Sequence, residues 1–254
     1  MLQVIDCIYV LKLLKNDKTE LQKSLNELFP DKKVNFYEVE GKTVNKNEGS
    51  INMSILKIIN QDYVDDVALD ITKNHIEMIK QAYNNNHQFV LFMEEDARIE
   101  KVSLKKLENV NQWLSNSKKW DIFYLGYCNY PLPVSFLVTT SIVKLWSPLN
   151  AHSYILNKRG MEKILNYTEY GKKNMNIHAD KMFKQIPYFN KYGMYPMISF
   201  QKKDPALFTK ACDKLNLRLS MKTVSKVIEN LSIIVPILFL ILITYLMMKL
   251  FFKV

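Results

Sequence analysis

The sequence predicts an α/β protein: a sheet with helices on both faces, followed by one membrane-spanning helix. Three observations lead to this fold class. Strand-like and helix-like segments alternate before residue 200, which favours a sheet covered by helices. Residues Gln88–Met93 form an uninterrupted apolar run, typical of a strand in the middle of a parallel sheet. An uncharged stretch, Leu231–Met248, lies near the end of the chain.

The remaining elements follow from periodicity and from turn residues. The apolar, β-branched run Leu2–Leu11 predicts a first buried strand, and a helix is expected after Asn16-Asp17, closed by Pro30. The further expected elements are a strand at Lys33–Glu40, a helix from about Val64 to Tyr83, a helix at about Leu104–Ser115 and a strand at Asp121–Leu125. No internal repeat and no flexible linker interrupts residues 1–200, so we expect one domain there.

The apolar stretch predicts a membrane anchor. A helix from Leu231 to Phe252 would be about 33 Å long, which matches a hydrocarbon core of about 30 Å. Pro236 is acceptable there, because spanning helices tolerate proline. The alternative is a buried core helix, which predicts a polar face, and only Ser232 and Thr244 are polar. No signal-peptide pattern is seen at the N-terminal end. We therefore expect residues 231–252 to span a membrane and residues 1–230 to lie in the cytosol.

Composition excludes several classes of protein. The 254 residues carry a net charge of +10, but only three of the 35 basic residues are arginine. A nucleic-acid reader would carry more arginine and a basic-aromatic platform. The three cysteines form no CxxC pair, so neither a disulfide framework nor a zinc site is indicated. Residues 201–230 carry seven basic and three acidic side chains, which predicts either a segment drawn to anionic headgroups or a solvated helix.

Three consecutive carboxylates, Glu94, Glu95 and Asp96, follow the apolar strand at Gln88–Met93. In open α/β sheets, ligands bind at the carboxyl ends of strands. Hard oxygen ligands suit Mg²⁺ or Mn²⁺, and such an ion bridges well to a diphosphate. The alternative is a solvated acidic loop, helped by the nearby Arg98 and Lys101. The cluster alone leaves both interpretations open.

An ordered set of short motifs around this cluster resembles glycosyltransferase family 25, which includes bacterial lipooligosaccharide and procollagen galactosyltransferases. No single motif is specific, but the set occurs in the family's order across nearly the whole of residues 1–201. The motifs are Ile8–Leu11, Asn74-His75, Met93–Asp96, Trp120–Gly126, Ala151–Gly160, Asp180, and Tyr195-Pro196 with Gln201.

The resemblance implies a GT-A-like mixed sheet and an enzyme, a hexosyltransferase that moves galactose or glucose from a UDP-sugar to a glycan, a lipid-linked sugar or a protein. It implies that Glu94 and Asp96 bind Mn²⁺ or Mg²⁺, with Asp96 also catalytic. By the same resemblance, Asn74, His75 and Glu95 would contact the donor. An inverting transferase also needs a base for the acceptor hydroxyl, and Asp180 is the candidate.

The chain departs from the family pattern at four places, one of which is Ala151–Tyr154, where the family has Ala-Tyr. The first strand continues Leu11-Lys12-Leu13-Leu14 where the family has Ile-Asn-Leu and a basic residue. Asn74 stands in place of a serine, and Glu95 in place of an aspartate. These departures leave a second hypothesis, a degenerate relative that acts as a membrane-anchored sugar-binding or scaffold protein.

Other single residues are interpreted more simply. Trp120 and Tyr124 are expected in the core, and Asp121 is expected to order the start of its strand. His152 and His178 have no zinc-ligand partners at useful spacing, so we expect them to bind no metal. The acceptor is expected to bind at a loop in Tyr127–Pro148, which contains prolines and several aromatic residues.

Overall fold

The computed structural model describes residues 2–13, 18–40, 66–129, 134–150, 152–170, 177–202 and 220–252. Leu14 in the altered first-strand motif, Ala151, and residues 203–219 of the predicted basic segment lie outside these ranges. The predicted bounds 1–200, 201–230 and 231–252 therefore stay predictions, although one helix, described below, begins inside the second range.

Eight strands form the central sheet, in the spatial order β2-β1-β3-β10-β5-β11-β8-β7. Their bounds are β1 Cys7–Leu13, β2 Lys33–Val39, β3 Phe89–Glu94, β5 Ile122–Tyr124, β7 Ser135–Thr139, β8 Ile142–Leu145, β10 Ser153–Asn157 and β11 Lys191–Met194. Strand β1 is parallel to β2 and β3, and β5 is parallel to β11. Strands β10 and β8 run antiparallel to their neighbours, so the sheet is mixed.

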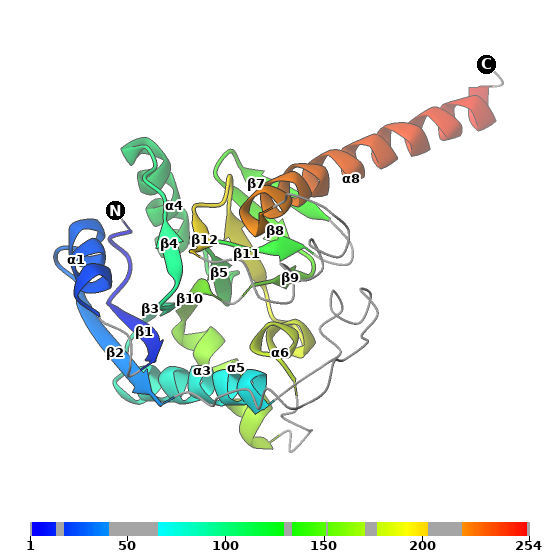
Figure 1. Ribbon diagram of the computed structural model, residues 1–254. Coiled ribbons are helices and arrows are strands. Elements are labelled where there is room, and N and C mark those ends of the chain that lie inside the picture. The colour runs from blue at the N-terminus through cyan, green and yellow to red at the C-terminus, as the bar shows by residue number, and fades with distance from the viewer. Residues whose placement is uncertain are drawn as a thin grey trace.

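Helices cover both faces of the sheet (Figure 1). Helices α3 (Asp66–Asn84), α5 (Lys158–Tyr170) and α6 (Ala179–Gln185) pack on one face, and α1 (Thr19–Leu28) and α4 (Leu104–Asn116) on the other. Two small antiparallel pairs complete the domain: β4 (Ala97–Ile99) with β12 (Ser199–Gln201), and β6 (Cys128–Asn129) with β9 (Pro148–Leu149).

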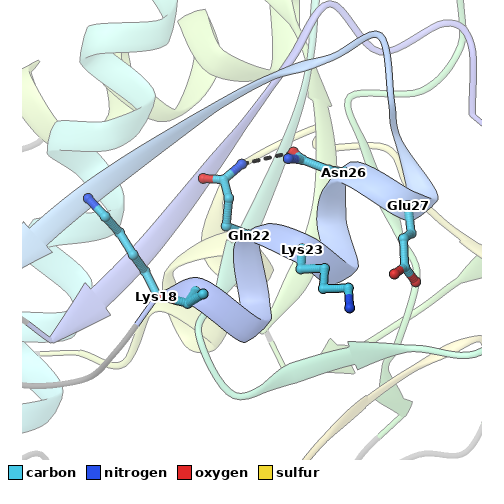
Figure 2. Close-up of a pocket in the computed structure, with 6 residues that line it drawn as sticks. Lys18, Gln22, Lys23, Asn26 and Glu27 are labelled. Atoms are coloured by element: carbon cyan, nitrogen blue, oxygen red, sulfur yellow. Dashed lines mark hydrogen bonds between the residues drawn. The ribbon is translucent and has the colours of Figure 1, made fainter.

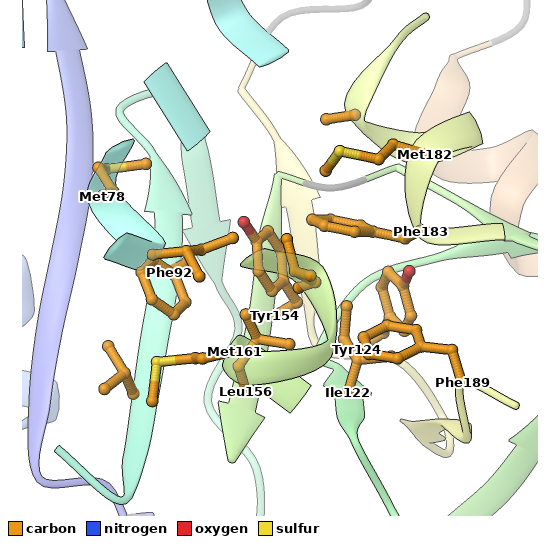
Figure 3. Close-up of a cluster of buried hydrophobic side chains, with 14 of the residues drawn as sticks. Met78, Phe92, Ile122, Tyr124, Tyr154, Leu156, Met161, Met182, Phe183 and Phe189 are labelled. Carbon is orange, nitrogen blue, oxygen red and sulfur yellow. The ribbon is translucent and has the colours of Figure 1, made fainter. Parts of the chain in front are cut away.

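The period-2 alternation of the strands explains the two cores. In β1, Cys7, Tyr9 and Leu11 face the α3 side, whereas Ile8 and Val10 face the α1 side. Because helices cover both faces of the sheet, a central strand does not have to alternate apolar and polar residues. Strand β3 is accordingly apolar throughout its buried part. Figure 3 shows the α3-side core, where aromatic rings surround Tyr154.

The sequence predicted this framework well. The predicted α/β fold class, with one apolar C-terminal helix, is confirmed. The predicted strands and helices before residue 126 are found with small shifts at their ends; the first strand, for example, begins at Cys7 instead of Leu2. The region Tyr127–Pro148 differs from the prediction of a loop, because its described residues form β6, β7, β8 and the start of β9.

The Trp120-Asp121 motif closes the end of the sheet away from the acidic cluster. Asp121 is fully buried, and its carboxylate accepts hydrogen bonds from Arg159 Nε (2.6 Å), Lys163 Nζ (2.9 Å) and the backbone N–H of Asn190 (2.8 Å). A Cβ on Gly160 would overlap the carbonyl oxygen of Asp121, so α5 approaches β5 this closely only with glycine there. The expected structural role of Asp121 is confirmed.

The last helix, α8 (Met221–Phe252), has two parts. Its first three turns pack on the domain, where Glu229 is buried and accepts hydrogen bonds from Tyr127 OH (2.9 Å) and the backbone N–H of Met197 (2.7 Å). The helix then leaves the domain beside β7 and β8 (Figure 1). By length and composition it is able to cross a membrane, and only 11% of its most apolar 18-residue window is buried. A buried core helix would show the opposite.

Candidate active site

The acidic cluster lies at the edge of the sheet where β1, β3 and β5 end. Because β10 runs antiparallel between β3 and β5, its first residue lies at the same edge, with Ser153 opposite Met93. The backbone N–H of Glu94 donates to the carbonyl of His152 (2.9 Å), and that of Glu95 donates to the carbonyl of Leu11 (3.0 Å). The edge therefore gathers segments that are far apart in the sequence.

The Glu94 side chain is held by a hydrogen-bonded chain of three residues. His75, on α3, is fully buried, and its Nε2 lies 3.3 Å from Glu94 Oε1. Its Nδ1 lies 2.8 Å from the hydroxyl oxygen of Tyr154 on β10. With the proton on Nε2, the imidazole donates to the carboxylate and accepts from the phenol, so every polar atom of the ring has a partner. His75 thus orients Glu94.

The environment of Glu94 favours its ionised form. Burial raises the pKa of this carboxyl group, but the hydrogen bond and charge of His75 outweigh it, together with the charge of His152 and a hydrogen bond from Gln201. The net result is a lowered pKa. Glu94 is therefore a carboxylate, half-buried and preorganised, at the open end of a buried strand.

Asp96 behaves in the opposite way. It lies with Glu95 in the turn between β3 and β4, and its Oδ1 atom is buried without a hydrogen-bond partner. Burial raises the pKa of Asp96 to about 7, and the negative charge of Glu94 adds to this effect. Arg98, whose guanidinium binds the carbonyls of Glu95 and Ala97, opposes the rise without cancelling it. A cation beside Asp96 would relieve this repulsion.

The structure also brings Asp180 to this region. Asp180 lies in the first turn of α6, and its Oδ2 accepts a hydrogen bond from the backbone N–H of Asn150 (2.9 Å). Burial lowers the pKa of His152, and the charges of both Glu94 and Asp180 act against that shift. Burial likewise raises the pKa of Tyr154, and the same two carboxylates contribute to that rise. Glu94 and Asp180 therefore act on the same two side chains.

Asn74 is placed differently from the other predicted residues. Its amide Nδ2 lies 3.4 Å from Asp70 Oδ2, one turn back on the same helix. Adjacent side chains in a helix point about 100° apart. Asn74 therefore does not share the direction in which His75 reaches Glu94. Its predicted role in donor binding stays a prediction, as do those of His75 and Glu95.

Sequence reasoning missed several residues of this edge, namely Tyr154, Gln201, and His152 as a neighbour of the carboxylates. Their only signal was membership in the resemblance motifs. Within the described part of the chain, buried side-chain oxygens without a partner include Asp96 Oδ1, Tyr124 OH, Ser153 Oγ and Ser199 Oγ, all from segments at this edge. Gly126 permits their close approach, since a Cβ there would overlap the carbonyl oxygen of Ser199.

The donor set fits a divalent ion only in part. Among the described residues, no three His, Cys, Asp or Glu side chains converge to form a complete metal cage. Mg²⁺, however, is usually held by one or two carboxylates together with substrate phosphates and water. Glu94, which is ionised, and the partnerless oxygen of Asp96 fit an ion shared with a diphosphate. They do not fit an ion held by the protein alone.

Two of the hollows lined by described residues are relevant to a ligand site, and neither is lined by Glu94, Asp96 or Asp180. A small cavity beside the carboxylate cluster is lined by His152, Ser199 and Gln201 on the domain and by Lys222 and Ser225 on α8. A wider surface hollow lies on the exposed face of α1 and shares no residue with the cluster (Figure 2). Its polar side chains pair with each other, as Gln22 Nε2 donates to Asn26 Oδ1 (2.8 Å), which is typical of a solvated helix face.

Two solved structures resemble this chain at low sequence identity. Neither a protein-family model nor a curated protein matches the chain. A solved glycosyltransferase involved in the glycosylation of the major capsid of PBCV-1 shares 12% identity over 83% of this chain and 100% of its own, with a TM-score of 0.40. A197 from STIV shares 12% identity over 79% of this chain and 87% of its own, with a TM-score of 0.38. At this distance, function must be argued from the residues of the site.

Proposed function

We propose that this chain is a GT-A-like hexosyltransferase that uses a UDP-sugar, most simply UDP-galactose or UDP-glucose. The acceptor would be a hydroxyl of a glycan, a lipid-linked sugar or a protein. One observation carries the proposal: Glu94, Asp96 and Asp180, together with buried polar atoms that lack a partner, gather at the carboxyl edge of a buried sheet. That edge is where open α/β sheets bind ligands.

In this proposal Glu94 and Asp96 would hold a Mn²⁺ or Mg²⁺ together with the donor's diphosphate. Such an ion would offset the charge that develops on the leaving UDP. Glu94 is already ionised and oriented by His75 before the donor binds. Asp96 has to lose a proton, because its pKa of about 7 leaves much of it protonated at neutral pH. Donor binding should therefore strengthen as the pH rises through 7.

Asp180 is the proposed base. Its carboxylate takes the proton from the acceptor hydroxyl while that oxygen bonds to the anomeric carbon of the sugar. The bond between this carbon and the diphosphate oxygen breaks, and its electron pair leaves with UDP. The sugar carbon passes through an oxocarbenium-like transition state, and its configuration inverts. The hydrogen bond from Asn150 N–H holds Asp180 for this task.

The exposed part of α8 supports a membrane anchor in the same proposal. Its apolar side chains are exposed, and the helix is long enough to cross a bilayer. The domain would then lie in the cytosol, and the acceptor would be a molecule that reaches the cytosolic face of that membrane.

The first experiment measures UDP release by the full chain in detergent, with a panel of UDP-sugars and with or without Mn²⁺. Asp96→Asn should abolish metal-dependent release, whereas Asp31→Asn, the same change at an exposed turn, should leave it intact. Asp180→Asn should abolish transfer but preserve donor binding measured by calorimetry. Release that is equal in wild type and Asp96→Asn would refute the proposal.

A second candidate function is favoured by one observation, the lack of a three-ligand metal group among the described residues. In that case the chain is a non-catalytic relative that binds sugars or acts as a scaffold at the membrane. Calorimetry separates the two candidates. Mn²⁺-dependent binding of a UDP-sugar supports the transferase, and absence of any such binding supports the scaffold.

A further inference from the structure

Strand β7 is an exposed apolar edge of the sheet. It is the last strand in the spatial order, and four consecutive residues, Phe136–Thr139, are exposed. Phe136, Leu137 and Val138 are 49%, 52% and 44% exposed. An edge strand of a water-soluble domain is normally protected by charge, proline or a covering element. None of these three residues is charged, so we expect another molecule to cover this edge.

Strand β7 also lies against α8 at the point where that helix leaves the domain. Ser232 Oγ donates to Ser135 Oγ (3.0 Å), and both side chains are buried. One step further out, an apolar groove is lined by Val134 and Phe136 on one side and by Val235, Pro236, Phe239 and Leu240 of α8 on the other. Exposed apolar side chains of strand and helix therefore form one continuous surface.

The length of α8 fixes where a bilayer would begin. The domain buries Ile233, whereas Ile234 and the apolar side chains that follow it as far as Met248 are largely exposed. From Ile234 to Phe252 the helix is about 28 Å long, which is about the thickness of the hydrocarbon core. The exposed apolar stretch follows Ile233 directly, with no polar spacer between them, so the bilayer surface would meet the domain beside Val235 and Pro236. That is the level of Phe136.

We propose that β7 and the adjacent Trp146 lie in the headgroup region of the bilayer, as a second membrane contact beside α8. Trp146 is 67% exposed and follows Leu145, which pairs with Ser135 at the end of the hairpin nearest α8. Tryptophan prefers this interfacial depth in membrane proteins. The proposal rests on the insertion of α8 proposed above, and it names lipid as the occupant of the β7 edge.

The depth follows from the backbone. An edge strand has unpaired N–H and C=O groups, which the hydrocarbon core cannot accept because no water reaches them there. The headgroup region supplies water and phosphate oxygens. The strand can therefore bury its side chains partly while its backbone polar groups keep hydrogen-bond partners. The contact is therefore shallow, unlike that of α8.

Fluorescence quenching in vesicles tests this depth. The full chain carries Cys212→Ser and one new labelled cysteine, while Cys7 and Cys128 are buried. Labels go at Leu137→Cys on β7, at Ile241→Cys on the exposed part of α8, and at Leu104→Cys on α4, an equally apolar position on another element that is 72% exposed. The vesicles contain phosphatidylcholine with a nitroxide either on the headgroup or on the acyl chain.

We expect the headgroup nitroxide to quench the Leu137→Cys label at least about twofold more than the Leu104→Cys label, and more than the acyl nitroxide does. The Ile241→Cys label should be quenched by the acyl nitroxide. If it is quenched and the labels at 137 and 104 behave alike, α8 is inserted but the β7 contact is refuted. If it is not quenched, the anchor itself fails and the β7 contact fails with it. Cross-linking between two copies at Leu137→Cys without lipid quenching would assign the edge to a second chain and overturn the proposal.

Discussion

At the scale of single residues, Glu94 occupies the boundary between the core and the open edge of the sheet. Its backbone still belongs to β3, and its side chain is half-buried. An ionised carboxylate loses free energy when it leaves water, unless hydrogen bonds replace the lost hydration. His75 supplies one such bond, and Tyr154 fixes the orientation of the ring that supplies it. The buried histidine thus orients the carboxylate, which would face the donor in the proposed reaction.

A substitution series at His75 tests this role. His75→Ala removes the donor to Glu94. If Glu94 holds the proposed ion, we expect kcat/KM to fall roughly 10- to 100-fold, the usual loss when a residue that orients a metal ligand is removed. His75→Gln should lose less, because its amide can still donate. Without His75, burial dominates and the pKa of Glu94 rises, so the acid limb of the pH profile should move to higher pH. A profile of His75→Ala that coincides with that of wild type would contradict this role.

Asp96 provides a test based on stability. Its pKa is about 7 in the folded protein and about 4 in an unfolded chain. Between these values the folded state holds a proton that the unfolded state has lost, so the free energy of unfolding falls as the pH rises. Asp96→Asn removes this cost. In EDTA at pH 8, its free energy of unfolding should exceed that of wild type by about 1–3 kcal/mol, and the gain should shrink toward pH 4.

Urea unfolding of the detergent-solubilised full chain at both pH values measures this difference. Asp31→Asn, at an exposed turn, should show no pH-dependent gain. A gain for Asp96→Asn that is the same at pH 4 and pH 8 would mean that the effect does not come from titration of Asp96.

At the scale of elements, the sequence predicted those parts whose pattern is local. The uninterrupted β3, the long α3 and the apolar α8 have periodicity or length that no other element would show. Strand β7 was missed because it lies at the sheet edge with four of its five residues exposed, so it shows no alternation of apolar and polar residues. It was interpreted as part of a loop.

Residue patterns alone indicated the site only where its residues are consecutive, and His75 and Asp180 were named only through the family resemblance. Glu94 and Asp96 follow a recognisable strand, so their position at the sheet edge was clear from the sequence. Tyr154 and His152 reach them only because β10 lies antiparallel between β3 and β5, with Ser153 opposite Met93. Strand order and register depend on packing between distant segments, and no local pattern in this sequence reports them.

The contact of α5 with the start of β5 is one of the closest backbone contacts in the described part of the domain. Gly160→Ala would place a methyl group against the carbonyl of Asp121, and neither backbone has room to move because Asp121 is tied to Arg159, Lys163 and Asn190. We expect the free energy of unfolding to fall by about 2–4 kcal/mol. Glu162→Ala, at an exposed position of the same helix, should change it by less than about 0.5 kcal/mol. Similar values for both variants would show that the helix can shift.

At the scale of the whole molecule, α8 belongs to the domain as well as to the proposed anchor. Two shortened chains separate these roles. A chain that ends at residue 234 keeps Glu229, Ser232 and Ile233, whereas a chain that ends at residue 225 loses them. The shorter chain leaves Tyr127 OH and the N–H of Met197 without their acceptor and exposes apolar surface. It should be less stable by about 2–4 kcal/mol in urea unfolding without detergent. Equal unfolding midpoints would show that the docked turns of α8 add nothing to the domain.

Because α8 is one continuous helix, it would fix the distance between the candidate site and the bilayer surface. Lys222 and Ser225 line the cavity beside the carboxylates, and the helix leaves the domain near Ile234, so about 13–18 Å of helix separates the two levels. A flexible tether with as many residues would let the site sample a wide range of distances from the lipid. A continuous helix instead keeps the distance between the site and the bilayer nearly constant. With α8 in the membrane, acceptors would be selected by how far their hydroxyl stands above the bilayer, in addition to their chemistry.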